Sequence, residues 1–344
     1  MADTLWIHPV CTKLTTSCMG PFAHLPNGDI VGFEGVKGTR SCDGGRTWEP
    51  WGTPPPRTYG EFKPGGETAL LCTREGTLVR VFSNLNEANL EWDSATHRAS
   101  ENTRLPVYAT RSEDGGKTWL APVKLQESWC GAIRDMIQTC EGRIVVTSQV
   151  LTAGNSRHAT LTYSSDDDGR TWEAGNLIDL GGRGNHGGCC ESAVEELRDG
   201  RFWLLIRTNL GQFWSAFSDD GRYWRTMQPS GIEASSAPAG LKRLSDGRLV
   251  MLWNRPGPED GREWPLTGGD MEWSEYPVSN FREELSLAIS GDDGSTWSAP
   301  VVVARKADAW LSYPYLYEPE PGTLWVTTMQ GGVRMAVDVA RVER

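Results

Sequence analysis

Five copies of one octapeptide constrain the fold of this chain more than any other feature of its sequence. The pattern, which we call the Asp box, is Ser-x-Asp-x-Gly-x-x-Trp, and its copies begin at Ser41, Ser112, Ser165, Phe217 and Ser290. The fourth copy has lost the leading serine, and its key aspartate is then Asp219. A short carboxylate that bonds backbone N–H groups closes a turn, glycine supplies a positive φ, and tryptophan fills the space between neighbouring sheets. We therefore interpret each copy as a structural device that closes a hairpin.

The spacing of the copies predicts the architecture. The second, third and fourth key aspartates lie about 50 residues apart, which suits one four-stranded blade of a propeller. A second repeat, an apolar run followed by a glycine turn and another apolar run, occurs six times, with turns at Gly28, Gly76, Gly142, Gly200, Gly247 and Gly322. Together the repeats predict an all-β, six-bladed β-propeller with five Asp-box hairpins, in which residues 1–344 form a single domain. The two longer gaps predict rim insertions at about 84–104 and 254–281, which are placed either to cover a mouth of the ring or to form a contact between copies.

Charge and composition exclude several classes of function. The chain has 34 basic and 45 acidic residues and a net charge of −11, so we expect no nucleic-acid partner. No apolar stretch is long enough for a membrane helix, so we expect no membrane partner. The first residues show no signal peptide, which favours a cytoplasmic location, although a signal already removed would leave the same pattern. The eight cysteines show no metal-ligand spacing, and no nucleotide-binding motif is present, so we expect neither a metal nor a cofactor.

Chain direction predicts where a site would form. The starts of the first strands and the ends of the second strands gather at one mouth of the central channel. These positions are unusually polar for residues near a propeller axis, which predicts a pocket for a polar ligand. The residues are Met19, Glu67, Arg134, Asp135, Glu191, Ser235 or Ser236, and Tyr313 at first-strand starts, and Glu34, Asn84, Gln149, Arg207, Asn254 or Arg255, and Gln330 at second-strand ends.

The Asp boxes resemble those of the sialidase (neuraminidase) superfamily, whose members are six-bladed propellers. The resemblance covers essentially the whole chain. It implies that Tyr313 is the nucleophile, that Glu191 activates it, and that Arg207 and Arg282 bind a substrate carboxylate. The chemistry is coherent, since a neutral phenol attacks poorly and a neighbouring glutamate can take its proton. Paired guanidinium groups bind a carboxylate through bidentate hydrogen bonds.

Two departures from the sialidase pattern affect the predicted site. Met19 stands where the family's Phe-Arg-Ile-Pro motif has its arginine, and residues 34–40 contain no aspartate where the family has its acid/base. Asp135, His186 or Glu34 is then left to act as acid/base. The substrate-binding candidates beyond the two arginines are Arg134, Gln149, Asn254 and Gln330. This exchange of charges suggests a site adapted to another acidic sugar, such as a uronic acid.

Three functions are consistent with this pattern. The first is a sialidase-like, exo-acting glycoside hydrolase on a carboxylate-bearing sugar, with Tyr313 as nucleophile. The second is a polysaccharide lyase on a uronic-acid glycan, in which Tyr313 or His186 removes the proton next to the carboxylate and Arg134 or Arg207 neutralises the enolate. The third is a carbohydrate-binding propeller without catalysis. In each case the partner is a carbohydrate.

Overall fold

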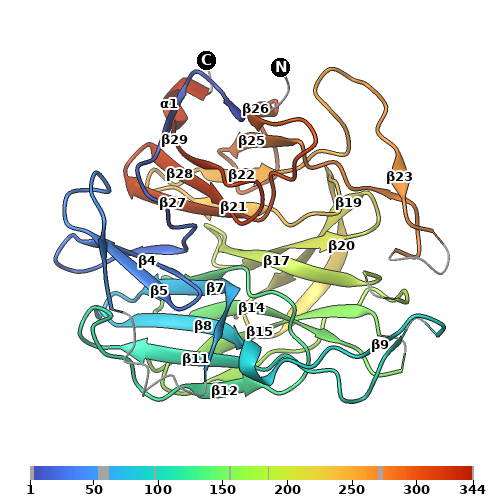
Figure 1. Cartoon of the computed structure of the whole chain (residues 1–344), viewed down its shortest axis with the longest axis horizontal. Helices are drawn as coiled ribbons and strands as arrows, with labels where there is room; N and C mark the ends of the chain where they lie inside the picture. The colour runs from blue at the N-terminus through green and yellow to red at the C-terminus, as the bar shows by residue number, and fades with distance from the viewer. Residues whose placement is uncertain are drawn as a thin grey trace.

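Six antiparallel sheets surround a common axis. The computed structural model describes residues 4–52, 62–96, 98–154, 156–184, 186–269 and 274–342. Within these ranges the colours of Figure 1 change in chain order from sheet to sheet, from blue to red. The innermost strand of each sheet contacts those of both neighbouring sheets, round to the contact of β27 (Pro314–Glu320) with β3 (Phe22–His24). The prediction of an all-β, six-bladed propeller is confirmed.

Each blade has four strands in a simple order, one sheet carries a fifth strand at its outer edge, and we number the blades one to six along the chain. The innermost strands are β3, β7 (Pro64–Cys72), β13 (Met136–Gln138), β17 (Cys189–Glu196), β21 (Gly240–Arg243) and β27. The second strands are β4 (Ile30–Glu34), β8 (Leu78–Asn84), β14 (Ile144–Leu151), β18 (Phe202–Thr208), β22 (Leu249–Trp253) and β28 (Thr323–Thr328). The third strands are β5 (Lys37–Ser41), β11 (Val107–Ser112), β15 (His158–Ser165), β19 (Gln212–Ser218), β25 (Glu284–Ser290) and β29 (Arg334–Asp338). The outer strands are β6 (Glu49–Pro50), β12 (Val123–Gln126), β16 (Glu173–Ala174), β20 (Trp224–Glu233), β26 (Val301–Arg305) and β2 (Cys11–Lys13).

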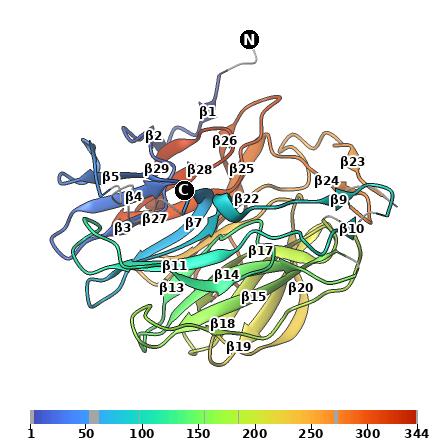
Figure 2. The ribbon, with the colours of Figure 1, turned by 60° about the horizontal axis from the view of Figure 1, so that its bottom comes forward.

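The ring closes through the N-terminal segment. The outer strand of blade six is β2, which pairs with β29 in the register Cys11 to Val337. A further short strand, β1 (Trp6–Ile7), pairs with β26 of blade five, and a short helix, α1 (Val339–Val342), follows β29. Figure 2 shows β1 and β2 beside these partners. This closure explains why the sixth unit lacks an Asp box, because its last strand does not follow it in the chain.

The Asp boxes close their turns as the sequence predicts. In the first box, Ser41 donates to Asp43 at 2.8 Å, and the same carboxylate accepts bonds from the Thr47 N–H at 2.9 Å and the Thr47 hydroxyl at 2.7 Å. The glycine has a second role, because a Cβ on Gly45, whose φ is 86°, would lie 2.2 Å from Trp325 of blade six. The box therefore lets neighbouring blades approach closely.

The fourth Asp box differs from its predicted alignment. Ser218 donates to Asp220 at 2.9 Å, and the Asp220 carboxylate accepts a bond from the Tyr223 N–H at 2.8 Å. The interpretation that this box had lost its serine, with Asp219 as key residue, is therefore wrong. The box is one residue shorter than the others, and Ser218 and Asp220 perform the usual roles.

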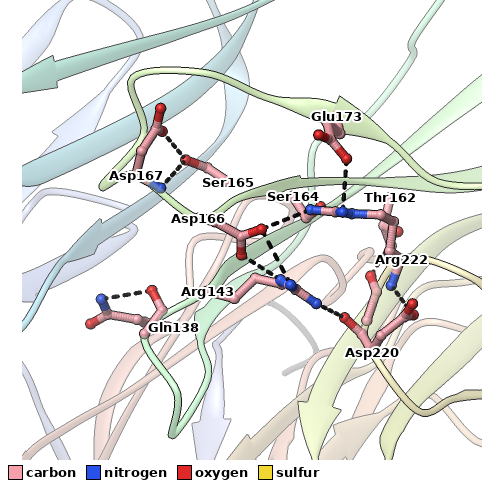
Figure 3. A network of polar contacts seen from close by, with 12 residues as sticks. Gln138, Arg143, Thr162, Ser164, Ser165, Asp166, Asp167, Glu173, Asp220 and Arg222 are labelled. Carbon is pink, nitrogen blue, oxygen red and sulfur yellow. Dashed lines mark hydrogen bonds and ion pairs between the residues drawn. The ribbon is translucent and has the colours of Figure 1, made fainter.

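Charged side chains link blades three and four next to this turn (Figure 3). Arg143 binds the Asp166 carboxylate at 2.6 Å and the Asp220 carbonyl at 2.6 Å. Arg222 binds the other oxygen of Asp166 at 3.0 Å and forms an ion pair with Glu173 at 2.7 Å. Because these groups come from different blades, the network fixes one blade against the next.

Two hairpins extend beyond the blades. The 3-10 helix η1 (Leu85–Glu87), β9 (Trp92–Asp93) and β10 (Arg98–Ala99) lie between β8 and β11, and β23 (Leu266–Thr267) and β24 (Val278–Ser279) lie between β22 and β25. Figures 1 and 2 both show β9 and β23 on the same side of the molecule. Residues 97 and 270–273 of the predicted insertions lie outside the described residues. Both hairpins follow second-strand ends, which places them at the mouth that carries the predicted site.

The fourth Asp box provides a matched pair of variants. Asp220→Ala removes the acceptor of the turn, and we expect it to lower the free energy of unfolding by about 1–3 kcal/mol, because buried or turn-bound N–H groups lose their partner. Asp219 is exposed, and we expect Asp219→Ala to change stability by less than about 0.5 kcal/mol. Urea unfolding measures both. Equal effects of the two substitutions would contradict the assignment.

Candidate functional site

A β-bulge in β17 positions Glu191. Cys190 pairs with Arg207 and Ala193 with Leu205, so Glu191 and Ser192 share one partner position on β18. The backbone of Glu191 has a φ of 46°, in the left-handed region that non-glycine residues rarely adopt. Its N–H donates to the Gln149 side-chain carbonyl at 2.9 Å. Bulges of this kind redirect side chains next to functional sites.

Glu191, Arg207 and Tyr313 form a closed triangle. The Tyr313 hydroxyl donates to Glu191 Oε1 at 3.0 Å. Arg207 Nη1 binds Glu191 Oε2 and also donates to the Tyr313 hydroxyl, at 3.1 Å. Tyr313 directly precedes β27, and its φ of 62° is again in the left-handed region. Blades four and six therefore bring together three residues that the sequence predicts for one site.

Burial and charge set the protonation of this triangle. Burial favours the neutral form of Glu191, but Arg207, together with Arg134 and the hydrogen bond from Tyr313, holds the pKa of Glu191 below its ordinary value. Burial, followed by the Glu191 carboxylate, raises the pKa of Tyr313 above its ordinary value. At neutral pH the site therefore holds a carboxylate beside a neutral phenol. This is the arrangement of a base and a nucleophile that needs activation.

Arg282 is a buried cation beside the triangle. It lies before β25, is 5% exposed, and binds Gln330 Oε1 at 3.0 Å and the Ser236 carbonyl. Ser236 also accepts a bond from Arg207 Nη2, at 2.8 Å, which ties the two arginines to one residue. Arg282 forms no ion pair with any carboxylate of the described residues. Burial, and then the charge of Arg207, lowers the pKa of Arg282 to about 10, so the site favours an anionic partner.

Aromatic rings and a third arginine surround the phenol. The Arg134 guanidinium lies 5.2 Å from the Tyr313 ring centre and donates to the Pro314 carbonyl at 2.9 Å. The Arg282 guanidinium lies 5.6 Å from the Tyr313 ring centre and 4.6 Å from that of Trp310. Trp310 is 51% exposed, which leaves one face of an aromatic ring at the mouth.

The other predicted residues lie in different surroundings. Glu34 accepts a bond from the Met19 N–H at 3.0 Å in blade one. The Asp135 carboxylate accepts bonds from the N–H groups of Met136 and Val194, at 2.9 and 3.0 Å. None of these groups binds the triangle among the residues that the structure describes.

His186 and Asn254 also differ from the expected pattern. The His186 ring centre lies 6.0 Å from that of His158, and burial, followed by the charge of Arg207, lowers the pKa of His186 to about 3. The imidazole is therefore neutral in the physiological range. Asn254 donates to the carbonyls of Glu284 and Leu311, at 2.7 and 3.0 Å, and so braces the backbone near Arg282.

Asp135 lies instead in an axial channel. The innermost strands line a cavity of about 300 Å³ that contains Asp135, Glu195 and Lys242. Burial raises the pKa of Asp135 to about 6 and that of Glu195 to about 7. The channel therefore holds two carboxyl groups that favour their neutral form.

Trp310 was not predicted for the site. Glu67 and Ser236 were predicted only as positions at the mouth, Ser236 as an alternative to Ser235, and neither was given a role. Their signals are weak because a serine before a strand or a tryptophan in a loop is common in any β-protein. Only the packing of blades four, five and six reveals that Ser236 bridges two arginines.

Two further searches concern metals and membranes. Among the described residues, no three His, Cys, Asp or Glu side chains come together as metal ligands. In the same part of the chain, no helix is long and apolar enough to cross a membrane.

Comparison with known proteins places this chain in a family. Residues 61–326 match the BNR repeat-like domain. The chain is 24% identical over 287 residues to a sialidase of Bacteroides fragilis (strain YCH46), which covers 76% of this chain and 47% of the relative. It is 25% identical over 319 residues to a sialidase of Micromonospora viridifaciens, which covers 86% of this chain and 46% of the relative. The chain thus spans about half the length of these curated relatives.

Solved structures share the fold. A protein of unknown function from Dyadobacter fermentans aligns with a TM-score of 0.63 at 17% identity, covering 96% of this chain and 98% of that one. The NanB sialidase from Streptococcus pneumoniae aligns with a TM-score of 0.61 at 13% identity, covering 97% and 71%. The Penicillium chrysogenum alpha-L-arabinanase, complexed with arabinobiose, aligns with a TM-score of 0.60 at 14% identity, covering 99% and 98%. At these identities the likeness shows the propeller fold alone.

The channel carboxyl of Glu195 predicts a pH-dependent stability. Folding raises its pKa from an ordinary value of 4.5 to about 7, so its stabilising contribution is complete below about pH 4.5 and is lost as the pH rises to about 7. Glu195→Gln keeps an acceptor for the Arg243 N–H, which lies 2.8 Å from Oε1, but cannot ionise. We expect the variant to match the wild type near pH 4.5 and to exceed its free energy of unfolding at pH 8 by on the order of 2 kcal/mol.

Denaturant unfolding at pH 4.5, 6 and 8 measures this difference. The exposed carboxylate of Glu101 provides the control, because Glu101→Gln should leave the pH dependence unchanged. A difference between Glu195→Gln and wild type that is the same at all three pH values would contradict the prediction.

Proposed function

The chain belongs to the BNR repeat-like domain family within the sialidase superfamily, and from this premise we propose that it is an exo-acting glycoside hydrolase that cleaves a carboxylate-bearing sugar. The family match and the sialidase relatives support a hydrolase of this superfamily. The substrate is argued from the site, because one fold carries many activities. The alpha-L-arabinanase among the structural neighbours illustrates this, since its structure is a complex with arabinobiose.

The hydrogen bond from Tyr313 to Glu191, at 3.0 Å, carries the proposal. In the first step the Tyr313 oxygen attacks the anomeric carbon while Glu191 accepts the phenolic proton. Sialidases depart from the two-carboxylate rule of glycosidases by using a tyrosine in this way. Arg207 keeps Glu191 ionised for the proton transfer and lies within hydrogen-bond distance of the oxygen on which charge develops.

The surroundings of Arg282 support the proposal that the substrate is an acidic sugar. A buried guanidinium without a carboxylate partner among the described residues is costly unless a ligand supplies the negative charge. Arg207 Nη2 and Arg282 Nη2 both bind Ser236, so they are held close enough to contact one carboxylate together. Met19 supplies no third guanidinium, which favours a broader acidic-sugar specificity, including uronic acids, over strict recognition of sialic acid.

The burial of the site supports action at a chain end. Arg207 is 3% exposed and Tyr313 is 8% exposed, so the reacting groups lie at the bottom of the mouth. Such a position suits one terminal sugar better than a polysaccharide running through an open groove. A cavity of about 280 Å³ beside it, lined by residues including Asn209, Ser274 and Tyr276, offers room for the neighbouring part of a glycan.

A panel of aryl glycosides tests the activity. We expect the wild type to release the aryl alcohol from an α-sialoside or a uronide, and not from the matching neutral glycosides. We expect Tyr313→Phe to reduce kcat by about a thousandfold or more, because the nucleophilic oxygen is lost, with little change in Tm. Near-normal turnover by this variant would contradict the nucleophile assignment. A product that absorbs in the near ultraviolet would instead indicate a lyase.

Arg282→Met tests the carboxylate clamp. We expect it to raise KM for the acidic substrate by about a hundredfold, because hydrogen bonds to a charged group contribute about 1.5–3 kcal/mol. We also expect Tm to stay equal or to rise, since a buried cation without an ion-pair partner is removed. Unchanged KM, measured together with kcat, would exclude Arg282 from carboxylate binding.

A further inference from the structure

Glu67 occupies a position that parallels that of Glu191. In β7, Pro64 pairs with Asn84 and Thr68 with Phe82, so residues 65–67 bulge from the ladder. This is the same kind of irregularity that positions Glu191 in β17. A Cβ added to Gly66 would meet no atom within 4 Å, so open space adjoins Glu67. The Glu67 side chain is 15% exposed, while its Oε2 atom is buried.

Among the described residues, the Glu67 carboxyl group has one oxygen that forms no hydrogen bond and one ion-pair partner. Its buried Oε2 has no hydrogen-bond partner, and its nearest charged neighbour is Arg134, whose Nη1 lies 3.7 Å away. Arg134 itself lies against the Tyr313 ring, so Glu67 is one guanidinium away from the nucleophile. Glu191 and Glu67 both lie close enough to Tyr313 for an ionised carboxyl group at either position to raise the pKa of the phenol. Glu191 is already committed to the phenol and to Arg207, which leaves Glu67 as the second acid of the site.

The other acid/base candidates, Glu34, Asp135 and His186, are less suited to donate a proton to the leaving group. The hairpin of β4 and β5 pairs Glu34 with Lys37, so only two residues form its turn and no acidic loop extends over the site. Glu34 accepts the Met19 N–H, and Asp135 accepts two backbone N–H groups in the axial channel. The His186 imidazole is neutral in the physiological range. Blade one therefore lacks the acid/base aspartate of the sialidase pattern, and the carboxyl group of Glu67 in blade two is the candidate to replace it.

We propose that Glu67 is the general acid and base of this site, a role that rests on the hydrolase function proposed above. As Tyr313 attacks, the bond from the anomeric carbon to the leaving oxygen breaks, and that oxygen takes the proton of the Glu67 carboxyl group. The resulting Glu67 carboxylate then takes a proton from water, the water oxygen attacks the anomeric carbon, and the bond to Tyr313 breaks. Glu191 returns its proton to the phenolate, so the cycle ends with every group restored.

The surroundings of Glu67 keep it protonated before reaction. Burial raises the pKa of Glu67 above its ordinary value, Arg134 opposes this, and the Glu191 carboxylate adds to it. A carboxyl group that retains its proton near neutral pH is suited to donate it. The charged and titratable groups that interact with Glu67 are Arg134, Glu191, Arg207, Tyr313, Tyr315 and the thiols of Cys130 and Cys190.

Leaving-group dependence tests this role. Glu67→Gln should fold like the wild type, because the amide replaces a neutral carboxyl group of the same shape. For a substrate with a poor leaving group, such as an alkyl glycoside or a natural disaccharide, we expect kcat/KM to fall by about a hundredfold to ten-thousandfold. For a dinitrophenyl glycoside of the same sugar, which needs no protonation, we expect kcat/KM to fall less than about tenfold. The alkaline limb of the wild-type pH profile should disappear in Glu67→Gln.

Glu34→Gln is the matched control, and we expect it to retain both activities and the alkaline limb. Equal losses by Glu67→Gln on both leaving groups, with an unchanged Tm, would overturn the acid role while leaving the hydrolase function intact. The leaving-group pattern in Glu34→Gln instead would transfer the role to Glu34. A wild type inactive on every acidic glycoside would overturn the hydrolase function, and the role of Glu67 with it.

Discussion

The buried ion pair between Glu191 and Arg207 is the interaction on which the site depends. A carboxylate in this environment would hold its proton if it were alone, because burial disfavours the charged form. Arg207 reverses that preference and at the same time contacts the Tyr313 hydroxyl. Removing one member of such a pair leaves an uncompensated charge in the protein interior. The pair as a whole is nevertheless no general source of stability, because burying both charges costs about as much as their attraction returns. In the proposed mechanism, the pair provides an ionised Glu191 carboxylate that can accept the proton of the Tyr313 hydroxyl.

The propeller scaffold holds this pair against an unfavourable backbone. Glu191 and Tyr313 both adopt a positive φ, which costs about 1–3 kcal/mol for a residue other than glycine. Two strands, the side chain of Gln149 and the closed ring oppose relaxation of these residues. The pairing of β2 with β29 matters here, because an open ring would allow blade six, which carries Tyr313, to move away from blade four. Asp boxes and inter-blade networks such as that of Arg143 and Asp166 provide the stiffness between blades.

Much of the fold could be predicted because its signals are local. Each Asp box closes its own turn with residues inside eight positions, so its pattern predicts a hairpin wherever it occurs. The fourth box was misaligned because a one-residue deletion preserved the spacing of Asp219, Gly221 and Trp224 while moving the turn to Ser218 and Asp220. Closure by β2 has no local signal at all, since its partner lies at the other end of the chain.

The site was predictable only where a strand position determines a side chain's direction. Glu191, Arg207 and Tyr313 lie at strand starts or ends that face the mouth, and the structure brings them together. Asp135 occupies such a position too, but its carboxyl group binds the N–H groups of Met136 and Val194. Glu67 carried the same sequence signal as many polar mouth residues, and only its bulge and a buried carboxyl oxygen without a hydrogen bond distinguish it. In the proposed centre, Tyr313 and Glu191 form the nucleophile pair of blades six and four, and the proposed acid, Glu67, lies in blade two.

Covalent trapping tests the central claim of this account most directly. A glycosyl fluoride of the cleaved acidic sugar, with a second fluorine next to the anomeric carbon, should transfer its sugar to the enzyme and break down slowly. Peptide mapping by mass spectrometry should then find the added sugar mass on the Tyr313 side chain. A label on Glu191, on another residue or on none, in protein that cleaves the parent glycoside, would contradict a phenol nucleophile activated by Glu191.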